Sequence, residues 1–451
     1  MDYNSLKEGL FFYNPWWTTE NVPRDLAMDY HRPVLGRIIS YLDLDRIVIL
    51  KGSRRTGKTT LLYQLIENLL QKGVNPKNIL FLSFDDPKVR HDVDEIIKAY
   101  QEITKKRVDS VEMFYLILDE VQFLEGWQFS VKKYFDRKYP IKFIISGSAA
   151  TLIKRKSESL AGRTIEEIIF PFSFYEYFSY QIADKRIVAL VDDLRQSFDI
   201  NKLPEITSLI PHLTEIKIIF NEYIIRGGFP NLFGITEDLI WKKLVREDII
   251  EKVIYKDLVD LYDIKKPEAM ERLFLYLIDI TAQILNVTNI ANSIDLSREY
   301  TEKYLIYFEQ AFLIKRLKKY AKSVEKIIRS SDKVHIIDPG LINAFAKVEE
   351  GQLLESVVAS HLMRVENAKL YYFREKYELD FVLSIGKDII PMEIKNKVDI
   401  SGNDLRGLRS FAKRFKTNLA IVVTKERQEQ RTIDGVDTLF IPAWLFLLLL
   451  H

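Results

Sequence analysis

A glycine-rich motif near the start of the chain limits the folds open to it. Residues 52–59 read Gly-Ser-Arg-Arg-Thr-Gly-Lys-Thr and fit the pattern G-x-x-x-x-G-K-[ST] of a phosphate-binding loop. The short apolar run Ile47–Leu50 precedes the motif, and apolar residues recur at helical spacing from Leu61 to Leu69 after it. In this strand–loop–helix order, backbone N–H groups and the positive end of a helix surround an anion.

The motif therefore predicts a site for the phosphates of a nucleotide. Lys58 is expected to reach the β- and γ-phosphates, and the hydroxyl of Thr59 is expected to bind Mg²⁺. The residues predicted to contact ATP are Gly52, Ser53, Arg54, Arg55, Thr56, Gly57, Lys58, Thr59 and Thr60.

Two acids follow a later apolar run and complete the prediction. The run Leu116–Leu118 leads directly into Asp119 and Glu120. Asp119 is expected to hold Mg²⁺ through water, and Glu120 to polarise the water that attacks the γ-phosphate. The next apolar run ends at Ser146, whose side chain is expected to point at the same phosphate.

Arg163 is a candidate for stabilising transition-state charge, either in its own chain or in a neighbouring copy. The alternative is a structural ion pair, and the sequence does not separate the two. Four continuous apolar runs separated by helical stretches predict a parallel sheet that is covered on both faces.

The amino-acid composition excludes several classes of protein. The chain of 451 residues has no cysteine, which excludes disulfide scaffolds, thiol catalysis and iron–sulfur clusters. Its 66 Lys and Arg nearly balance 64 Asp and Glu, so nucleic-acid binding requires a local patch. The longest apolar run, Ala443–Leu450, is far shorter than the roughly 20 residues of a membrane span. A cytoplasmic protein is therefore the expectation.

Further landmarks cover nearly the whole chain. They are Asn14-Pro15-Trp16-Trp17, Leu118-Asp119-Glu120-Val121-Gln122, Ser146-Gly147-Ser148, Ala161-Gly162-Arg163, the stretch 171–177, Arg226-Gly227-Gly228-Phe229-Pro230 and Asp338-Pro339-Gly340-Leu341. With them the chain resembles the prokaryotic, largely archaeal, AAA-superfamily P-loop ATPases that carry a C-terminal winged helix and a restriction-endonuclease-like domain of the PD-(D/E)xK type.

This resemblance implies an α/β fold class with four parts. A P-loop NTPase core with a parallel sheet is expected over residues 1–150, and a helical lid over 151–240. A winged helix-turn-helix is expected over 241–345, and a small α/β nuclease-like domain over 346–451.

A strand pair near the C-terminus predicts a second site. If Gly386-Lys387 is a two-residue hairpin turn, Ile385 pairs with Asp388, and counting outward places Asp380 opposite Glu393. Directly opposed residues share a face, as does Lys395 two residues on. Two facing carboxylates repel each other, so a cation is expected between them.

The resemblance to PD-(D/E)xK nucleases supplies a role for this group. It implies that Asp380 and Glu393 bind Mg²⁺ or Mn²⁺ and that Lys395 helps to activate water for attack on a phosphodiester. Glu355, on a preceding helix, is the candidate third acid. The alternative keeps the fold without catalysis and holds the acids in salt bridges.

A basic run after a helix–turn–helix pattern predicts a partner. Thr288–Ile294 reads as a short helix, and Ser297 is expected to cap a second helix that runs to about Ala311. Its predicted outer surface is formed by Arg298, Tyr300, Thr301, Lys303, Tyr304 and Tyr307. Residues 315–333 then contain eight Lys or Arg and two acids. DNA binding through Lys315, Arg316, Lys318 and Lys319 is the favoured hypothesis, and docking of a protein is the alternative.

Together these patterns predict a Mg²⁺-dependent ATPase coupled to a DNA-binding winged helix and a metal-dependent nuclease domain. The alternative is a nucleotide-gated switch that binds a partner and has an inactive nuclease-like domain. A homo-oligomer is compatible with both hypotheses.

Overall fold

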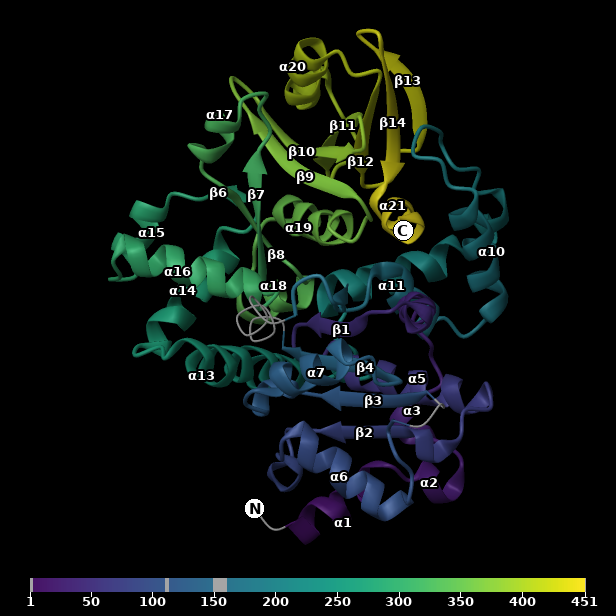
Figure 1. The fold of residues 1–451 in the computed structure, drawn as a ribbon. Helices are drawn as coiled ribbons and strands as arrows, with labels where there is room; N and C mark the ends of the chain where they lie inside the picture. The colour runs from purple at the N-terminus through teal and green to yellow at the C-terminus, as the bar shows by residue number, and fades with distance from the viewer. Residues whose placement is uncertain (1–2, 110–112, 149–159, 451) are drawn as a thin grey trace. The chain divides into compact units, whose positions relative to one another are not determined.

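A computed structural model describes residues 3–109, 113–148 and 160–450 of the chain. The chain forms two compact units (Figure 1). Unit 1 contains residues 1–170 together with the short segment Lys256–Asp263, and unit 2 contains Pro171–Tyr255 and Ile264–His451.

Unit 1 is built around a parallel sheet of five strands. Its order is β2-β3-β4-β1-β5, and each neighbouring pair is parallel. The strands are β1 (Ile47–Gly52), β2 (Ile79–Ser83), β3 (Phe114–Asp119), β4 (Ile141–Ser148) and β5 (Thr164–Ile168). The helices of this unit include α1 (Tyr3–Tyr13), α2 (Trp16–Thr19), α3 (Arg24–Ala27), α4 (Val34–Ser40), α5 (Lys58–Gln71), α6 (Val93–Thr104), α7 (Trp127–Asp136) and α13 (Val259–Tyr262). The four predicted strands are confirmed, and β5 is an additional strand.

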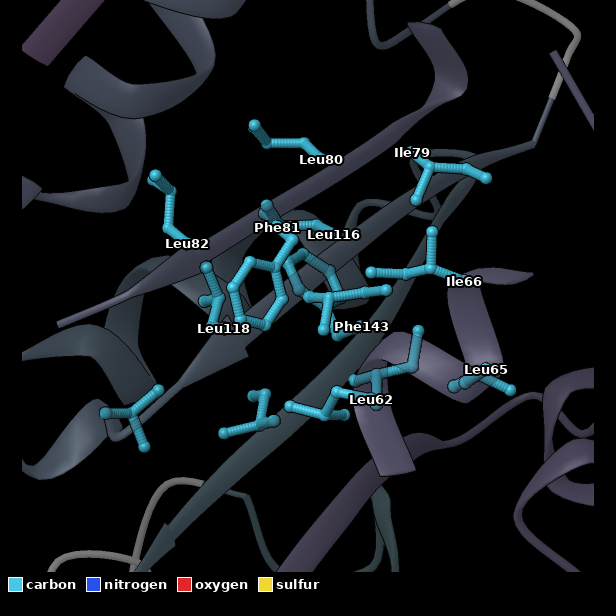
Figure 2. Packing of buried hydrophobic residues seen from close by; sticks show 14 of the residues in the cluster. Leu62, Leu65, Ile66, Ile79, Leu80, Phe81, Leu82, Leu116, Leu118 and Phe143 are labelled. Atoms are coloured by element: carbon cyan, nitrogen blue, oxygen red, sulfur yellow. The ribbon is translucent and has the colours of Figure 1, made fainter. Parts of the chain in front are cut away.

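The core of unit 1 explains why its strands read as continuous apolar runs. Helix α5 directs Leu62 and Ile66 toward the sheet, where they lie near Phe81, Leu116 and Phe143 (Figure 2). All five side chains are almost completely buried. A strand with helices on both faces has no solvent side, so alternation of polar and apolar residues is lost.

The N-terminal segment covers the free edge of this sheet. Strand β2 is an edge strand, and the side-chain amide of Asn14 donates to the carbonyl of Phe81 (2.9 Å) and accepts from its N–H (2.7 Å). The indole N–H groups of Trp16 and Trp17 donate to the carbonyl of Ile79 at 3.2 and 2.9 Å. The segment therefore satisfies backbone groups that an exposed edge would leave open to another strand.

Unit 2 contains a mixed sheet of nine strands among its described residues. Its order is β13-β14-β12-β11-β10-β9-β7-β8-β6. The strands are β6 (Gln283–Ile284), β7 (Ile314–Lys319), β8 (Lys333–Ile336), β9 (Ala368–Arg374), β10 (Glu378–Ile385), β11 (Asp388–Lys395), β12 (Leu419–Thr424), β13 (Glu429–Ile433) and β14 (Val436–Pro442). Because β7 pairs with β9, the strands of the predicted winged helix and of the predicted nuclease-like domain form one continuous sheet.

Helices occupy much of the rest of unit 2. They are α9 (Phe174–Gln181), α10 (Lys185–Gln196), α11 (Leu213–Arg226), α12 (Asp238–Leu244), α14 (Pro267–Asp279), α15 (Val287–Ser293), α16 (Arg298–Gln310), α17 (Val324–Ile328), α18 (Pro339–Phe345), α19 (Glu350–Leu362), α20 (Arg406–Phe415) and α21 (Ala443–Leu449). A π-helix, η7 (Val245–Leu258), continues from unit 2 into the segment that belongs to unit 1. No helix in the described ranges is both long enough and apolar enough to span a membrane.

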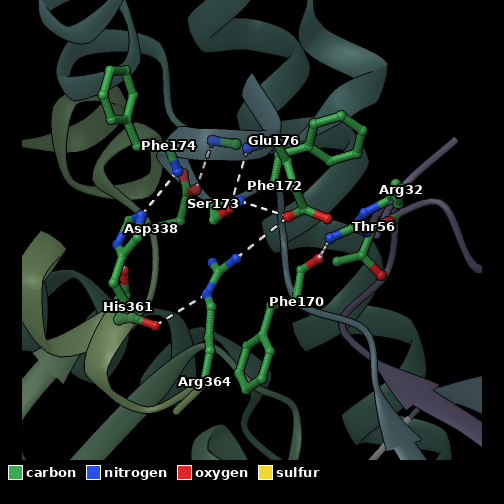
Figure 3. Close-up of polar contacts among 12 residues, drawn as sticks. Arg32, Thr56, Phe170, Phe172, Ser173, Phe174, Glu176, Asp338, His361 and Arg364 are labelled. Carbon is green, nitrogen blue, oxygen red and sulfur yellow. Dashed lines mark hydrogen bonds and ion pairs between the residues drawn. The ribbon is translucent and has the colours of Figure 1, made fainter. Parts of the chain in front are cut away.

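Residues 171–240, predicted to be part of a helical lid on the ATPase core, belong to unit 2. The backbone N–H of Phe174 donates to Nε2 of His361 at 2.9 Å, and the Arg364 guanidinium lies 3.7 Å from the Glu176 carboxylate (Figure 3). Ser173 and Glu176 form a capping box that begins α9. These contacts join the start of α9 to His361 of α19 and to Arg364, which follows α19.

Candidate functional site

The phosphate-binding loop lies between β1 and α5, as the sequence predicts. Its backbone requires glycine at both ends. Gly57 has a φ of +89°, a conformation that costs glycine little. A Cβ atom on Gly52 would lie 2.2 Å from the carbonyl oxygen of Ile169, so this position admits no side chain.

Lys58 lies inside the loop. Its ammonium donates to the carbonyl oxygens of Ser53 (2.8 Å) and Gly52 (3.3 Å). Burial lowers the pKa of Lys58, while Glu120 and Asp119 act in the opposite direction. A buried cation among carbonyls that carry only partial charges is suited to bind a phosphate oxygen in their place.

Asp119 meets the loop at the carboxyl end of β3. The Thr59 hydroxyl donates to one of its carboxylate oxygens at 2.8 Å, and the Ser146 hydroxyl donates to the other. Burial, followed by the charge of Glu120, raises the pKa of Asp119 to about 6. Divalent magnesium favours the ionised carboxylate, so the Thr59 and Asp119 oxygens fit a magnesium ion.

Glu120 follows in a left-handed conformation with a φ of +53°. Its carboxylate accepts a hydrogen bond from the side-chain amide of Gln122, whose carbonyl oxygen accepts from the Ser148 N–H at 3.2 Å. Gln122 therefore links the predicted base to the end of β4. The sequence marked Gln122 only as a landmark, with no role.

Arg163 lies at the opposite end of the sheet. It precedes β5, whose first residue Thr164 pairs with Ile47 at the start of β1. The loop begins at Gly52, five residues later, which at ~3.3 Å per residue is about 17 Å away. Its guanidinium pairs with Asp136 at 2.6 and 3.1 Å. Within one chain, Arg163 therefore forms the structural ion pair that was the alternative prediction.

Two residues of this site had no signal in the sequence. Arg32 donates to the Thr56 carbonyl at 2.8 Å and to the Phe170 carbonyl at 3.1 Å, which braces the loop against the chain after β5 (Figure 3). Asp257, in the segment Lys256–Asp263, accepts two hydrogen bonds from Arg54 of the loop. Arg32 and Asp257 both lie far from the loop in the sequence, in stretches that carry no motif.

The C-terminal hairpin has the predicted register. Ile385 pairs with Asp388, and the pairing continues to Phe381 and Met392, so Asp380 and Glu393 are the next pair outward. Gly386 has a φ of +58° in the turn. One oxygen of Asp380 accepts from the Ile394 N–H at 2.7 Å.

Lys333 of β8 lies among the predicted metal ligands. Its buried ammonium is 2.6 Å from Glu355, 2.8 Å from Glu378 and 3.9 Å from Asp380. Burial opposes its charge, but these carboxylates raise the pKa of Lys333 overall. Burial raises the pKa of Glu355 to about 8, although Lys333 lowers it. The sequence counted Lys333 as part of an exposed basic run, which is wrong because its side chain is 1% exposed.

The contacts of Glu355, Asp380 and Glu393 show how well a metal ion fits this group of carboxylates. Lys395 pairs with Glu393 at 2.5 Å, but the second carboxylate oxygen of Glu393 is buried and has no hydrogen-bond partner in the described part of the chain. A bound cation would stabilise this buried oxygen. However, within the ranges that the structure describes, no group of three or more His, Asp or Glu side chains is arranged to hold a metal ion. With the ammonium of Lys333 beside Glu355 and Asp380, the cluster fits a metal poorly.

The predicted DNA surface is smaller than expected. Ser297 caps α16, as predicted, by accepting from the Tyr300 N–H at 3.2 Å. The prediction that Thr301 and Tyr304 face outward is wrong, because both are buried. Arg298, Tyr300 and Lys303 are exposed.

Ion pairs also engage part of the basic run. Arg316 lies 2.8 Å from Glu309, and Lys318 lies 2.8 Å from Asp332. Lys315 is exposed and Lys319 is partly exposed. The positive charge available to a partner is therefore lower than the count of basic residues indicates.

Comparison with known proteins divides the chain into three parts. Residues 44–178 match the family described as an AAA domain. Residues 218–352 and 350–444 match two domains of unknown function, DUF8612 and DUF4143.

Relatives that match this chain over most of their length occur in a bacterium and an archaeon. An uncharacterized protein of Haemophilus influenzae is 27% identical over 432 residues, which cover 93% of this chain and 99% of that protein. Two uncharacterized proteins of Methanocaldococcus jannaschii are 27% and 24% identical, covering 89% and 92% of this chain and 88% and 87% of their own lengths. These relatives do not support a mainly archaeal distribution.

Two solved structures show weak similarity. AMPPCP-bound DnaA from Aquifex aeolicus is 19% identical with a TM-score of 0.24, covering 66% of this chain and 93% of its own. C. elegans PCH-2 is 14% identical with a TM-score of 0.23, covering 41% and 54%. TM-scores this low support no conclusion about mechanism. The family match and the loop geometry agree, and the N-terminal part of the chain is an AAA-type P-loop ATPase domain.

Proposed function

We propose that this protein is a magnesium-dependent ATPase. The observation that carries the proposal is the contact between Thr59 and Asp119, 2.8 Å apart at the head of the phosphate-binding loop. A magnesium ion bound to the β- and γ-phosphates needs an oxygen from the loop and a second acid beside it. Ser146 holds the other oxygen of the same carboxylate and so orients it.

The roles of the remaining residues follow from their positions. Lys58 binds phosphate oxygens, since its ammonium already lies within the loop. Glu120 polarises the attacking water, with Gln122 holding its carboxylate. Arg163 serves a site in a neighbouring copy, if copies assemble, because it lies at the far end of its own sheet.

Replacing Glu120 with Gln tests the proposal. The variant is expected to bind ATP with affinity close to wild type and to hydrolyse it at least about 100-fold more slowly, because the base is lost while the phosphate contacts remain. Steady-state turnover and fluorescent-nucleotide binding measure the two effects. Glu125→Gln, at an exposed acid five residues on, is the matched control. Equal turnover of the two variants would contradict the role of Glu120.

For unit 2 the proposal is binding of DNA. Support comes from the exposed Arg298 on α16, from the exposed Lys413 of α20 and from the exposed Lys416 directly after α20. Lys413 and Lys416 line an open surface pocket of about 760 Å³. Lysines at such positions bind phosphate backbones without reading bases.

A second candidate function is a partner-binding switch without nuclease activity. The observation that favours it over a metal-dependent nuclease is Lys333, whose ammonium lies 2.6 Å from Glu355. A fixed cation in contact with the carboxylates weakens their affinity for a divalent ion by charge repulsion.

One experiment distinguishes these functions of unit 2. Purified protein is incubated with labelled linear duplex DNA and Mn²⁺ at increasing salt, beside Glu393→Ala. Binding that weakens steeply with salt, with no cleavage by either protein, is the expected result. Cleavage by the wild type that Glu393→Ala abolishes would instead establish the nuclease site, and binding insensitive to salt would contradict the DNA proposal.

A further inference from the structure

We propose that Asp257 binds the guanidinium of Arg54 in the phosphate-binding loop when no nucleotide is present. A phosphate of the bound nucleotide then displaces Asp257 from Arg54 and releases residues 256–263 from the loop. This inference rests on the proposed nucleotide site and adds a positioning residue to it. Asp257 is an anion from elsewhere in the chain that competes with the ligand for one of the loop cations.

The pair has the geometry of a strong charge-assisted contact. Arg54 donates from Nε to one oxygen of Asp257 at 2.6 Å and from Nη2 to the other at 2.5 Å. Both side chains are largely shielded from water, with exposed fractions of 17% for Arg54 and 7% for Asp257. A guanidinium offers the same fork of donors to a carboxylate and to a phosphate, so a phosphate that binds the Nε and Nη2 side of Arg54 must displace Asp257.

The Asp257 carboxylate is close enough to the proposed catalytic groups to interact with them electrostatically. Asp257 interacts electrostatically with Glu120, which it repels, and with Lys58, which it attracts. Burial raises the pKa of Asp257, whereas Arg54 lowers it. The negative charge beside Lys58 and Arg54 is thus supplied by the protein until a phosphate arrives.

The segment that carries Asp257 is short and belongs to unit 1, although the chain on both sides of it belongs to unit 2. Leu258 is fully buried, and the Lys256 ammonium lies 5.2 Å from the ring centre of Phe123, which follows Gln122. The segment therefore contacts the phosphate-binding loop through Asp257 and the residues after Glu120 through Lys256. Loss of the Arg54 pair removes a buried, two-bond contact between this segment and the loop.

Nucleotide affinity tests the competition. Asp257→Asn keeps the shape of the side chain and removes its charge. The variant is expected to bind a non-hydrolysable ATP analogue with Mg²⁺ about fivefold more tightly than the wild type. In an Arg54→Ala background the same substitution is expected to have no effect, because the shared partner is gone. Asp260→Asn, at an exposed acid of the same segment, is the control.

Hydrogen exchange of the unmodified protein tests the release directly. Adding the ATP analogue with Mg²⁺ is expected to speed amide exchange in residues 256–263 by several-fold. Unchanged or slower exchange there, or unchanged or weaker binding by Asp257→Asn, overturns the inference while leaving the nucleotide site intact. A failure of the wild type and every variant to bind nucleotide overturns the proposed function as well.

Discussion

Lys58→Ala is expected to lower ATP turnover at least about 100-fold and to weaken binding of ATP. The ammonium is buried in the loop, 2.8 Å from the carbonyl oxygen of Ser53. Its positive charge next to the phosphates is therefore not compensated by solvent when the side chain is removed. Its loss also leaves Asp119 and Glu120 less compensated, which disfavours the approach of another anion. Turnover at saturating ATP and nucleotide binding are both measured.

A matched control separates this effect from unfolding. Lys72→Ala removes an exposed lysine just beyond the end of α5 and is expected to leave turnover unchanged. Thermal unfolding of Lys58→Ala checks that the variant is folded. Undiminished turnover in a folded Lys58→Ala protein would contradict the assignment of the phosphate-binding loop.

Lys333→Met is expected to destabilise unit 2 by about 3–5 kcal/mol, because removing one partner of a buried ion cluster leaves the other charges uncompensated. Glu355, Glu378 and Asp380 all lie within 3.9 Å of the ammonium. Urea unfolding and hydrogen exchange of β8 and α19 measure the loss.

The destabilisation by Lys333→Met is expected to increase with pH. The pKa of Glu355 is raised to about 8 even with Lys333 present, so the folded state favours its protonated form. A group with a raised acid pKa stabilises the fold fully below its ordinary pKa and loses that contribution as pH rises toward the raised value. Without Lys333 the carboxyl group of Glu355 must be protonated to remain buried, so the variant is least impaired at low pH.

Two further variants provide the controls. Adding Glu355→Gln to Lys333→Met removes one of the uncompensated charges and is expected to restore part of the stability. Lys315→Met, at an exposed lysine of β7, is expected to change stability little. Equal stability of Lys333→Met and the wild type would mean that the acids do not depend on Lys333.

Local patterns were sufficient for the parts of the site that adjoin each other along the chain. The strand–loop–helix context of Gly52–Thr59 and the two acids Asp119 and Glu120 at the end of β3 were predicted without structural information, because each depends on the order of a few residues. The register of the C-terminal hairpin followed from one turn, since pairing in a two-residue hairpin is determined by counting outward from Gly386-Lys387. Helix α16 was also predicted from its cap at Ser297.

The sequence alone thus determined the phosphate-binding loop, the acids Asp119 and Glu120 at the end of β3 and the α/β class, because strand and helix periodicity and loop chemistry are properties of neighbouring residues. Only the tertiary structure decided which distant side chains meet. It placed Asp257 on Arg54, Lys333 among the C-terminal carboxylates, and Arg163 beside Asp136. Charge is visible in a sequence, but its partner is not, because residues 203 positions apart are brought together by the path of the folded chain.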